Sequence, residues 1–583
     1  MHRLATIARR SSPAAPLGAQ PHPSGVRAGL RRGLLVAVAA SVALLPGPPA
    51  YGQEPASQEA AAGGSAGLVE LAPVTWERLV HAADEPQNWL MYSGTLDSQR
   101  FSRLDQVDRT TVADLELKWA YSIRQLDRAE TTPLVVDGVM FITESPSNVT
   151  AVDATTGRPY WRYEHPLPDD LRICCGRNNR GVAILGETLY MSTLDAHLIA
   201  IDARTGNLVW DQEVADYRAG YSKTAAPLVV KDRIVTGIAG GEFGIRGFLD
   251  AYDAESGERA WRTYTIPGPD HPDNRTWAGD SWRTGGSPTW ITGSYDPELN
   301  LVYWGTGNPG PDWNGDVRLG DNLYADSVLA LDGVSGELKW YFQFTPHDVH
   351  DWDAIQIPVL ADITFEGEPR KAMLWANRNA FYYTLDRETG EFLLGEPFAL
   401  QTWAEGLDEN GRPIRLPDTF PTPEGVVVAP TAGGATNWWS PSYSPRTGLL
   451  YVNAFDGEGS FFIRDEEYRE GETYTGGGVQ QPAPMDNYQS AVRAIDPATG
   501  GVRWEFPMQP RARAGVLSTA GDVVFSATVD GSFFALDAET GEQLWFIPLG
   551  GPVNAVPMTY AVDGEQYVTM TVGNTVYTFG LDD

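Results

Sequence analysis

The sequence predicts an all-β chain that folds as an eight-bladed β-propeller with W-type (tryptophan-docking) repeats. Three observations lead to this fold class. A short pattern that ends in tryptophan recurs along the chain. The 583 residues include 19 Trp, 24 Tyr and 61 Gly, a composition that favours strands and tight turns over helical bundles. A further strand near residue 119 has the same tryptophan but no turn of its own.

The recurring pattern is apolar-x-apolar-Asp-x-x-Thr/Ser-Gly-x-x-x-Trp, and a fixed pattern of this kind indicates a repeat architecture. Each copy indicates a strand, a turn built by the Asp and the Gly, and a second strand whose Trp can pack between neighbours. The copies are Ala151–Trp161, Ala200–Trp210, Ala251–Trp261, Ala330–Trp340, Ala494–Trp504 and Ala535–Trp545, and a seventh, Thr384–Leu394, lacks the Trp.

Eight such units arranged radially form a β-propeller. We expect the strand around Trp119 to complete the last sheet, formed by Val553–Phe579, because this closure hides the sheet edges. The long gaps Trp261–Trp340 and Leu394–Trp504 must hold insertions. We expect these insertions on one face, where functional residues gather.

The N-terminal segment has the pattern of an export signal. Residues 1–52 contain six Arg and no acidic residue, followed by the apolar run Leu34–Leu45 and the small-x-small sequence Ala50-Tyr51-Gly52. The apolar run is too short to span a bilayer, and no other segment could. We therefore expect a cleaved signal peptide over residues 1–52, by the general or the twin-arginine route, and a periplasmic protein. Residues 53–75 are expected to be a flexible lead-in and residues 76–583 a single propeller domain.

The formal charge of −33 limits the partners. An anionic body of this size repels nucleic acid and anionic membranes and suits a basic partner, although plain solubility explains the same charge.

The two cysteines of the chain, Cys174 and Cys175, are adjacent. In an oxidising compartment they can close only onto each other, in a small strained ring that staples no loop. A strained ring that does not stabilise the fold points to a functional site. The alternative is a coincidental pair of small buried residues.

Four residues could form an oxygen-only site for a hard cation. Glu242 and Asn308 each follow a predicted strand beside glycines, and Asp351 and Asp353 lie two apart, so on an extended segment they would point the same way. Taken singly, each residue would more readily be a cap or turn residue, and only the four together in a Gly-rich setting favour a cation site.

Several motifs together resemble the quinoprotein alcohol dehydrogenases, the methanol/ethanol dehydrogenase family that uses pyrroloquinoline quinone. The resemblance runs from Asn88 to the end of the chain. Its motifs are Cys174–Gly181, Gly240–Gly247, Gly305–Pro309, Thr345–Asp353 and Gly434–Pro445. It implies an eight-bladed propeller with cofactor and metal on its axis, in agreement with the repeats.

The resemblance also implies roles for individual residues. Trp290 and the Cys174–Cys175 ring would enclose the flat cofactor, with core packing between blades as the alternative role of Trp290. Residues at the cofactor rim would be Glu130, Arg180, Thr224, Gly240, Gly241, Arg378, Asn437 and Trp438. The metal ligands would be Glu242, Asn308, Asp351 and Asp353. Pro288 and Arg513 depart from the family's pattern and leave the shape of the substrate pocket open.

The implied reaction is oxidation of a small primary alcohol to an aldehyde. Asp351 would take the alcohol proton and Arg378 would donate to the quinone oxygens. In this family, enzymes with a second Asp two places after the catalytic one use a lanthanide, so Asp353 predicts a trivalent lanthanide, with calcium as the alternative. No Cys-x-x-Cys-His motif is present, so we expect electrons to leave to a separate acceptor, a soluble cytochrome c. Whether the chain forms a homodimer is left open.

Two other classes of function compete with this one. A non-catalytic β-propeller scaffold of the cell envelope would explain the repeats, but not the paired cysteines or carboxylates. A transition-metal hydrolase would use His347, His350 and Asp353, but no second histidine cluster supports it.

Overall fold

The computed structural model describes residues 69–124, 128–480, 488–509 and 513–582. The predicted signal peptide, residues 1–52, and residues 53–68 of the predicted lead-in lie outside this part. From Val69 onward the chain is packed: Val69 and Val74 are buried, and Val74 pairs with Gly186.

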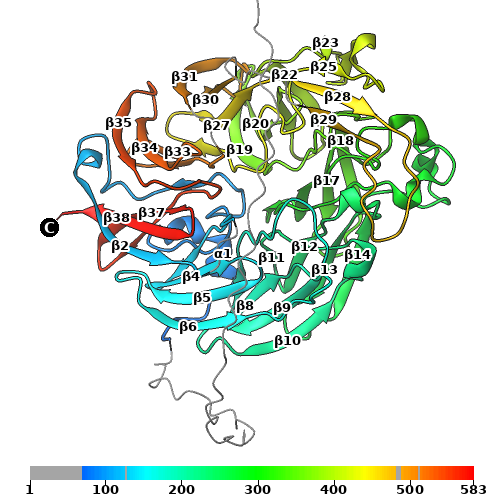
Figure 1. The fold of residues 1–583 in the computed structure, drawn as a ribbon. Coiled ribbons are helices and arrows are strands. Elements are labelled where there is room, and N and C mark those ends of the chain that lie inside the picture. Colours follow the sequence, from blue (N-terminus) through cyan, green and yellow to red (C-terminus); the bar gives the residue numbers. More distant parts are fainter. Residues whose placement is uncertain (1–68, 125–127, 481–487, 510–512, 583) are drawn as a thin grey trace, which may run out of the picture. The chain divides into compact units, whose positions relative to one another are not determined.

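The described part is an all-β propeller whose sheets follow one another around a centre (Figure 1). Eight of its sheets have four or more strands. The first four are β3 (Leu134–Val136), β4 (Val139–Glu144), β5 (Asn148–Asp153) and β6 (Pro159–Glu164); β7 (Ala183–Leu185), β8 (Thr188–Ser192), β9 (His197–Asp202) and β10 (Leu208–Glu213); β11 (Leu228–Val230), β12 (Arg233–Gly237), β13 (Phe248–Asp253) and β14 (Arg259–Tyr264); β15 (Ser294–Asp296), β16 (Leu301–Gly305), β17 (Ser327–Asp332) and β18 (Leu338–Gln343).

The other four complete the ring. They are β19 (Val359–Phe365), β20 (Glu368–Ala376), β21 (Phe381–Asp386) and β22 (Phe392–Pro397); β26 (Ser442–Ser444), β27 (Leu449–Asp456), β30 (Gln489–Ile495) and β31 (Val502–Met508); β32 (Leu517–Thr519), β33 (Val523–Ala527), β34 (Ser532–Asp537) and β35 (Gln543–Pro548), with β1 (Phe101–Ser102) parallel to β32; and β36 (Met558–Val562), β37 (Glu565–Val572), β38 (Thr575–Leu581) and β2 (Leu115–Ser122). The pairing of β2 with β38 confirms the predicted closure by the strand that carries Trp119.

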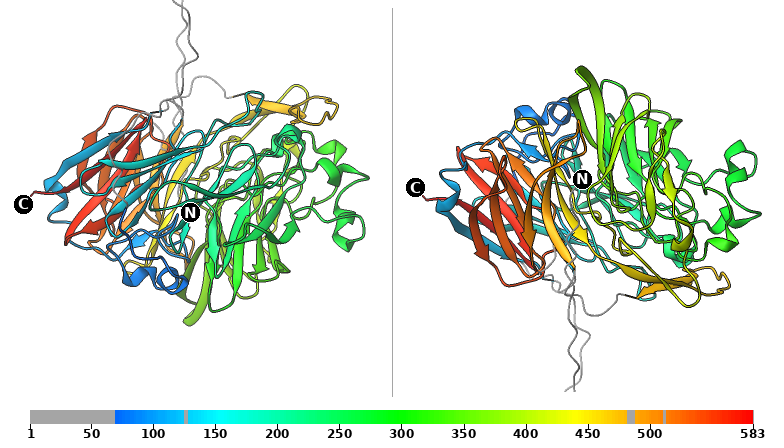
Figure 2. Two further views of the ribbon diagram at one scale, coloured as in Figure 1. Left: turned by 90° about the horizontal axis from the view of Figure 1, so that it is seen from below. Right: turned by 90° about the horizontal axis from the view of Figure 1, so that it is seen from above.

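Two small sheets and a few short helices lie in the connections. Figure 2 shows the sheet of β25, β28 and β29 beside the larger sheets. These elements are β23 (Ala404–Leu407), β24 (Pro413–Arg415), β25 (Val426–Val428), β28 (Gly459–Ile463) and β29 (Gly477–Gln480), the α-helix α1 (Trp76–Val80), and the 3-10 helices η1 (Ala82–Asp84), η2 (Val112–Asp114), η3 (Tyr217–Ala219), η4 (Gly241–Phe243), η5 (Pro272–Thr276), η6 (Ser281–Thr284), η7 (Gly315–Val317) and η8 (Pro417–Thr419). No helix in the described ranges is both long and apolar enough to span a membrane.

The repeat explains how the sheets hold together. In the first copy, Asp153 Oδ1 accepts from the Thr155 and Thr156 amides (both 2.9 Å), and Gly157 takes φ +68°. The ring of Trp161 in β6 lies against the Gly206 turn of the next sheet, and its indole donates to the Ala203 carbonyl (3.1 Å). The same ring-on-glycine contact recurs at Trp119–Gly157, Trp210–Gly257, Trp261–Gly336, Trp340–Gly390 and Trp504–Gly541.

Candidate active site

The candidate residues gather where the inner strands of several sheets begin. In an antiparallel pair, the start of the first strand and the end of the second lie at the same edge. Glu130, Cys174, Thr224, Trp290, Asp353 and Trp438 come shortly before β3, β7, β11, β15, β19 and β26, each the first strand of its sheet. Gly240, Asn308 and Arg378 follow β12, β16 and β20, each the second strand. The topology therefore brings these nine residues to one end of the propeller.

These segments surround a cavity of about 220 Å³, just below the range of about 300–1,000 Å³ common for ligand pockets. Its lining is Arg128, Glu130, Cys174, Cys175, Gly176, Asn178, Arg180, Ser222, Thr224, Ala239, Gly240, Glu242, Trp290, Asp351, Asp353, Arg378, Asn437 and Trp438. Thirteen of the fifteen residues predicted from the sequence are in this set. The two others, Gly241 and Asn308, lie just behind it: Gly241 packs against Pro288, and the Asn308 amide donates to Asp353 Oδ1 (2.8 Å).

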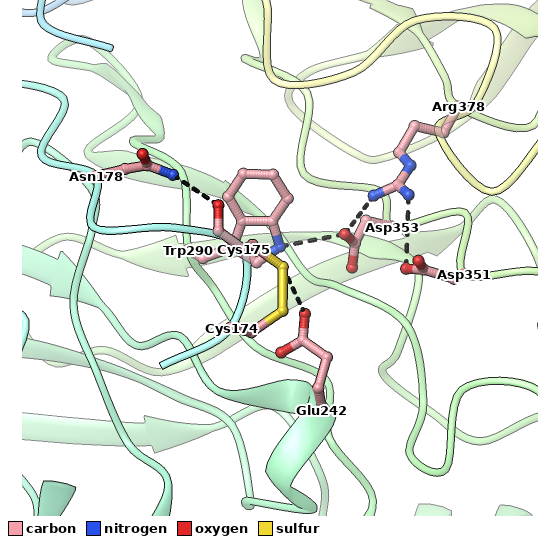
Figure 3. Close-up of a disulfide and its surroundings, with 8 residues drawn as sticks. All are labelled: Cys174, Cys175, Asn178, Glu242, Trp290, Asp351, Asp353 and Arg378. Atoms are coloured by element: carbon pink, nitrogen blue, oxygen red, sulfur yellow. Dashed lines mark hydrogen bonds and ion pairs between the residues drawn. A yellow bond between two sulfur atoms is a disulfide. The ribbon is translucent and has the colours of Figure 1, made fainter. Parts of the chain in front are cut away.

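Cys174 and Cys175 are joined to each other in a disulfide, as predicted. Cys175 Sγ lies 3.4 Å from Glu242 Oε1 (Figure 3). Burial raises the pKa of Glu242 to about 7, with the nearby Asp353 adding to the effect. Cys175 also has φ +66°, a left-handed conformation that costs a non-glycine residue on the order of 1 kcal/mol or more.

An arginine lies between two tryptophans at one side of the cavity. The guanidinium carbon of Arg180 is 5.0 Å from the centre of the Trp290 ring and 4.9 Å from that of Trp438. Its Nη2 pairs with Glu130 Oε2 (2.6 Å), and both residues are at least 95% buried. The Thr224 hydroxyl donates to the Trp290 carbonyl (3.2 Å), and Asn437 donates to the Gly433 carbonyl (2.9 Å), so these two side chains also fix the lining.

A second arginine holds the paired carboxylates. Arg378 donates through Nη1 to Asp353 Oδ2, and its Nη2 is 3.5 Å from Asp351 Oδ1 (Figure 3). The Trp290 indole donates to the same Asp353 oxygen (3.2 Å). Burial raises the pKa of Asp351 well above its usual range, against the opposing charge of Arg378.

The predicted reason why Asp351 and Asp353 lie close together was wrong. Asp351 and Asp353 do not lie on an extended segment, because Asp351 has φ +58° and β19 begins only at Val359. The two carboxylates meet because Arg378, from the loop after β20, reaches both of them.

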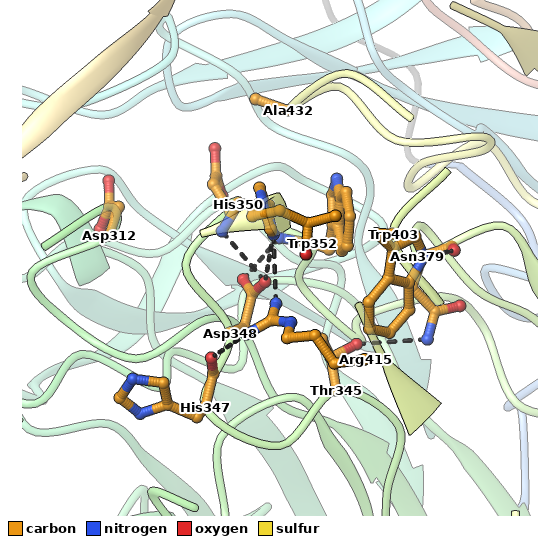
Figure 4. Close-up of polar contacts among 12 residues, drawn as sticks. Asp312, Thr345, His347, Asp348, His350, Trp352, Asn379, Trp403, Arg415 and Ala432 are labelled. Carbon is orange, nitrogen blue, oxygen red and sulfur yellow. Dashed lines mark hydrogen bonds and ion pairs between the residues drawn. The ribbon is translucent and has the colours of Figure 1, made fainter. Parts of the chain in front are cut away.

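The side chains of the two histidines in the same motif form hydrogen bonds with other residues. Arg415 donates to His350 Nδ1 (3.2 Å; Figure 4), so the proton is on Nε2, which donates to the Thr419 carbonyl (2.9 Å). His347 Nδ1 pairs with the Gly320 carbonyl (2.8 Å). Burial lowers the pKa of both rings, to about 4 for His347. The contacts of the two rings do not support the transition-metal hydrolase hypothesis.

Comparison with known proteins gives the family. The family model of the glucose/ethanol/alcohol dehydrogenase β-propeller domain matches residues 89–395. Quinoprotein alcohol dehydrogenase PedH of Pseudomonas putida KT2440 is 39% identical over 528 residues, which cover 86% of this chain and 89% of that protein. The chain belongs to the quinoprotein alcohol dehydrogenases.

Other members of the family agree in sequence and fold. A quinoprotein ethanol dehydrogenase of Pseudomonas putida is 37% identical over 550 residues, covering 86% of this chain and 88% of that one. A solved europium-containing methanol dehydrogenase superposes with a TM-score of 0.82 at 32% identity, covering 87% of this chain and all of that one. A model of the outer membrane protein assembly factor BamB matches only residues 489–583, which carry two of the repeats. The scaffold hypothesis accounts for those repeats but not for the cavity.

Sequence reasoning missed several buried ionisable residues of this quinoprotein, and it missed five residues that line the cavity: Arg128, Gly176, Asn178, Ser222 and Ala239. Asp312 follows the Gly305–Pro309 motif by three residues, so the distance to that motif could have pointed to it. Asp326 and Lys223 are also buried, but they sit in strand-flanking positions that look ordinary in the sequence. Only the folded chain reveals that all three are buried.

Proposed function

We propose that this quinoprotein oxidises small primary alcohols to aldehydes in the cavity bounded by the disulfide, Trp290 and the Asp351–Arg378–Asp353 group. The observation that carries the proposal is that one cavity joins three guanidinium groups, a flat aromatic wall and several acidic oxygens. When bound, pyrroloquinoline quinone would accept the two electrons that the alcohol loses, and a bound cation would polarise it.

The residues present fit such a cofactor. The Nε atoms of Arg180 and Arg378 and the Oδ1 atom of Asn178 are buried and have no hydrogen-bond partner among the described residues. Buried polar atoms are normally satisfied, so these groups suit a polar ligand. Arginine pairs bidentately with carboxylates, which fits a tricarboxylated molecule, and Trp290 offers a ring face to a flat one.

The acidic side of the cavity fits a hard cation. Glu242, Asp351 and Asp353 line it together, and Asn308 lies behind Asp353. We propose these four as the metal ligands, because buried carboxylates need a positive charge beside them and oxygen donors suit lanthanides or calcium. The europium-containing relative supports a lanthanide, with calcium as the alternative.

Asp351 is the residue placed to accept a proton. Its side chain is 29% exposed, whereas that of Asp353 is 6% exposed, so Asp351 can be reached from the cavity. In the proposed mechanism Asp351 removes the alcohol proton, while Arg378 orients both carboxylates and would donate to the cofactor when it is bound.

Three finer proposals accompany this function. The eight sheets with four or more strands would be the eight blades, and the recurring Trp-on-Gly contacts would make them W-type. Residues 1–52 would direct the chain to the periplasm, and the predicted lead-in would end before Val69, because residues from Val69 onward are packed into the domain predicted over residues 76–583. The acidic surface would receive a soluble cytochrome c as electron acceptor.

Reconstitution tests the function. Purified protein should gain a cofactor absorption band with pyrroloquinoline quinone and either La³⁺ or Ca²⁺, and should then reduce a dye when a short primary alcohol is added. Full activity with Ca²⁺ and none with La³⁺ would contradict the lanthanide assignment. No band and no activity with either ion would favour a non-catalytic scaffold.

A further inference from the structure

The three arginines that line the cavity differ in their partners. Arg180 pairs with Glu130 (2.6 Å). Arg378 pairs with Asp353. Arg128 lines the same cavity, but its side chain forms no salt bridge and no hydrogen bond with any described residue. The charge of Arg128 therefore has no role in the proposed function as it stands.

The backbone at Arg128 is nevertheless held in place. Its carbonyl accepts a hydrogen bond from the hydroxyl of Ser145 (2.6 Å), a residue that is 3% exposed. The next two residues, Ala129 and Glu130, are buried. Arg128 itself is exposed although it lines the cavity, so it lies at the mouth of the cavity, where the cavity opens to solvent.

A second arginine adds positive charge near this mouth. Arg513 comes shortly before β32, as Arg128 comes shortly before β3, so the topology places both at the end of the propeller that holds the cavity. Arg513 is half-buried, and burial together with the like charge of Arg128 lowers its pKa. Glu130 interacts with both arginines but is already paired with Arg180, so it offsets only one of the three positive charges around it. The excess positive charge attracts an anion.

We propose that Arg128 forms a carboxylate-binding site at the mouth of the cavity, with Arg513 as a second positive charge beside it. A guanidinium presents paired N–H donors that match the two oxygens of a carboxylate. Two ligands supply such a group: the tricarboxylated cofactor, and a substrate alcohol that carries a carboxylate at its far end. The inference rests on the proposed function, because it assumes that the cavity binds this cofactor and an alcohol.

Arg177 provides a matched control. It is an exposed arginine between two residues that line the cavity, Gly176 and Asn178, but it is not itself part of the lining. Like Arg128, it forms no salt bridge with another residue in the described part of the chain. Arg177→Gln therefore removes the same charge at the same end of the propeller, whereas Arg128→Gln removes it from the cavity lining.

The first part of the test measures cofactor binding without any turnover. The full chain is titrated with pyrroloquinoline quinone in the presence of La³⁺, and the absorption band of the cofactor gives the Kd. If the cofactor supplies the carboxylate, Arg128→Gln should raise this Kd on the order of 10-fold, because a hydrogen bond to a charged group contributes that much, while Arg177→Gln should change it less than about two-fold. Added salt should reduce the difference between wild type and Arg128→Gln, since the site is open to solvent.

The second part measures the substrate preference of the reconstituted enzyme. A series of ω-hydroxy carboxylates is compared with diols of equal chain length, and the KM is determined for each. If the substrate supplies the carboxylate, the wild-type KM should be about 10-fold lower for the hydroxy carboxylate than for the diol at the chain length that reaches the mouth. Arg128→Gln should lose this preference without a change in the Kd of the cofactor, and Arg177→Gln should keep it.

The possible results separate this inference from the proposed function. If Arg128→Gln changes neither the Kd of the cofactor nor the substrate preference, or if Arg128→Gln and Arg177→Gln lose the same amount, the inference is overturned and the proposed function stands. Cofactor-free Arg128→Gln should unfold at the same temperature as wild type, and a lower temperature would also overturn the inference, because the guanidinium would then support the fold. If wild type takes up no cofactor, the proposed function is wrong and this inference falls with it.

Discussion

The contact between a tryptophan of one sheet and a glycine of the next can be tested by adding a single methyl group. Gly206, in the turn between β9 and β10, donates its amide to the Asp202 carbonyl (2.8 Å) and has φ +73°. A Cβ atom placed there would lie 2.5 Å from Cε3 of Trp161. Gly448, between β26 and β27, makes the same turn with Ser444 (2.8 Å) at φ +68°, but no atom lies within 4 Å of its Cβ position.

The two glycines separate the backbone cost from the packing cost. Alanine in the left-handed region costs about 1–2 kcal/mol, of which about 0.4–1 kcal/mol is offset by the less flexible unfolded chain. Gly448→Ala should show this net cost alone. Gly206→Ala must also displace the Trp161 ring, and overpacking of this kind costs about 1–3 kcal/mol. We therefore expect Gly206→Ala to be the less stable variant by about 1–3 kcal/mol.

Urea unfolding followed by tryptophan fluorescence measures this difference, with the slope of the transition as a check that both variants lose the same surface. Equal unfolding midpoints for the two variants would refute the idea that the tryptophan ring is held against the neighbouring turn. In that case the sheets would be held by their inner strands alone.

Three further predictions concern the site and its surroundings. Asp351→Asn should lower the rate of alcohol-dependent dye reduction about 10²- to 10⁴-fold while the cofactor band is retained, because a positioned proton acceptor contributes a factor of that size. A loss of rate below about ten-fold would show that Asp351 is not the base. Burial lowers the pKa of Lys223 from 10.5 to about 7, so the unfolded chain binds more protons above pH 7. The unfolding free energy of wild type relative to Lys223→Met should therefore rise by about 1.4 kcal/mol per pH unit from pH 7 to 10 in urea titrations, and parallel profiles would contradict the low pKa. Replacing both Cys174 and Cys175 with Ala should hardly change the unfolding temperature, because the bond closes no loop, but should weaken cofactor binding on the order of 10-fold in a spectroscopic titration; a large loss of stability would give the disulfide a structural role instead.

The local parts of the structure could be predicted well because they depend on neighbouring residues. The Asp153 carboxylate reaches amides two and three positions ahead, and a glycine such as Gly157 supplies the positive φ that ends the turn. The partner of Trp119 could be predicted from the repeat, since an unpaired strand needs a sheet to complete. The adjacent cysteines could bond only to each other.

The long-range parts of the site could be predicted only as a set of residues. The motifs indicated that Asp351, Asp353 and Arg378 belong together, but not that the loop after β20 joins the two carboxylates from outside their own segment. Lys223 is next to Thr224 in sequence, yet its amine turns to the Gly237 carbonyl (2.8 Å) and away from the cavity lining. Successive side chains of a strand point to opposite faces of the sheet, so the direction of one side chain is known only when the register of its strand is known.

The sequence by itself determined the repeat, its turns, the closing strand and the identity of most residues around the cavity. The repeat, its turns and the closing strand depend on spacing along the chain, whereas most of the cavity residues follow from the resemblance of the motifs to the family. Only the tertiary structure decided which charges meet inside the protein. Arg180 meets Glu130, Trp290 and Trp438 because the loops that precede four different sheets line one cavity. Burial and electrostatic interactions act through space, between residues that are far apart in the sequence.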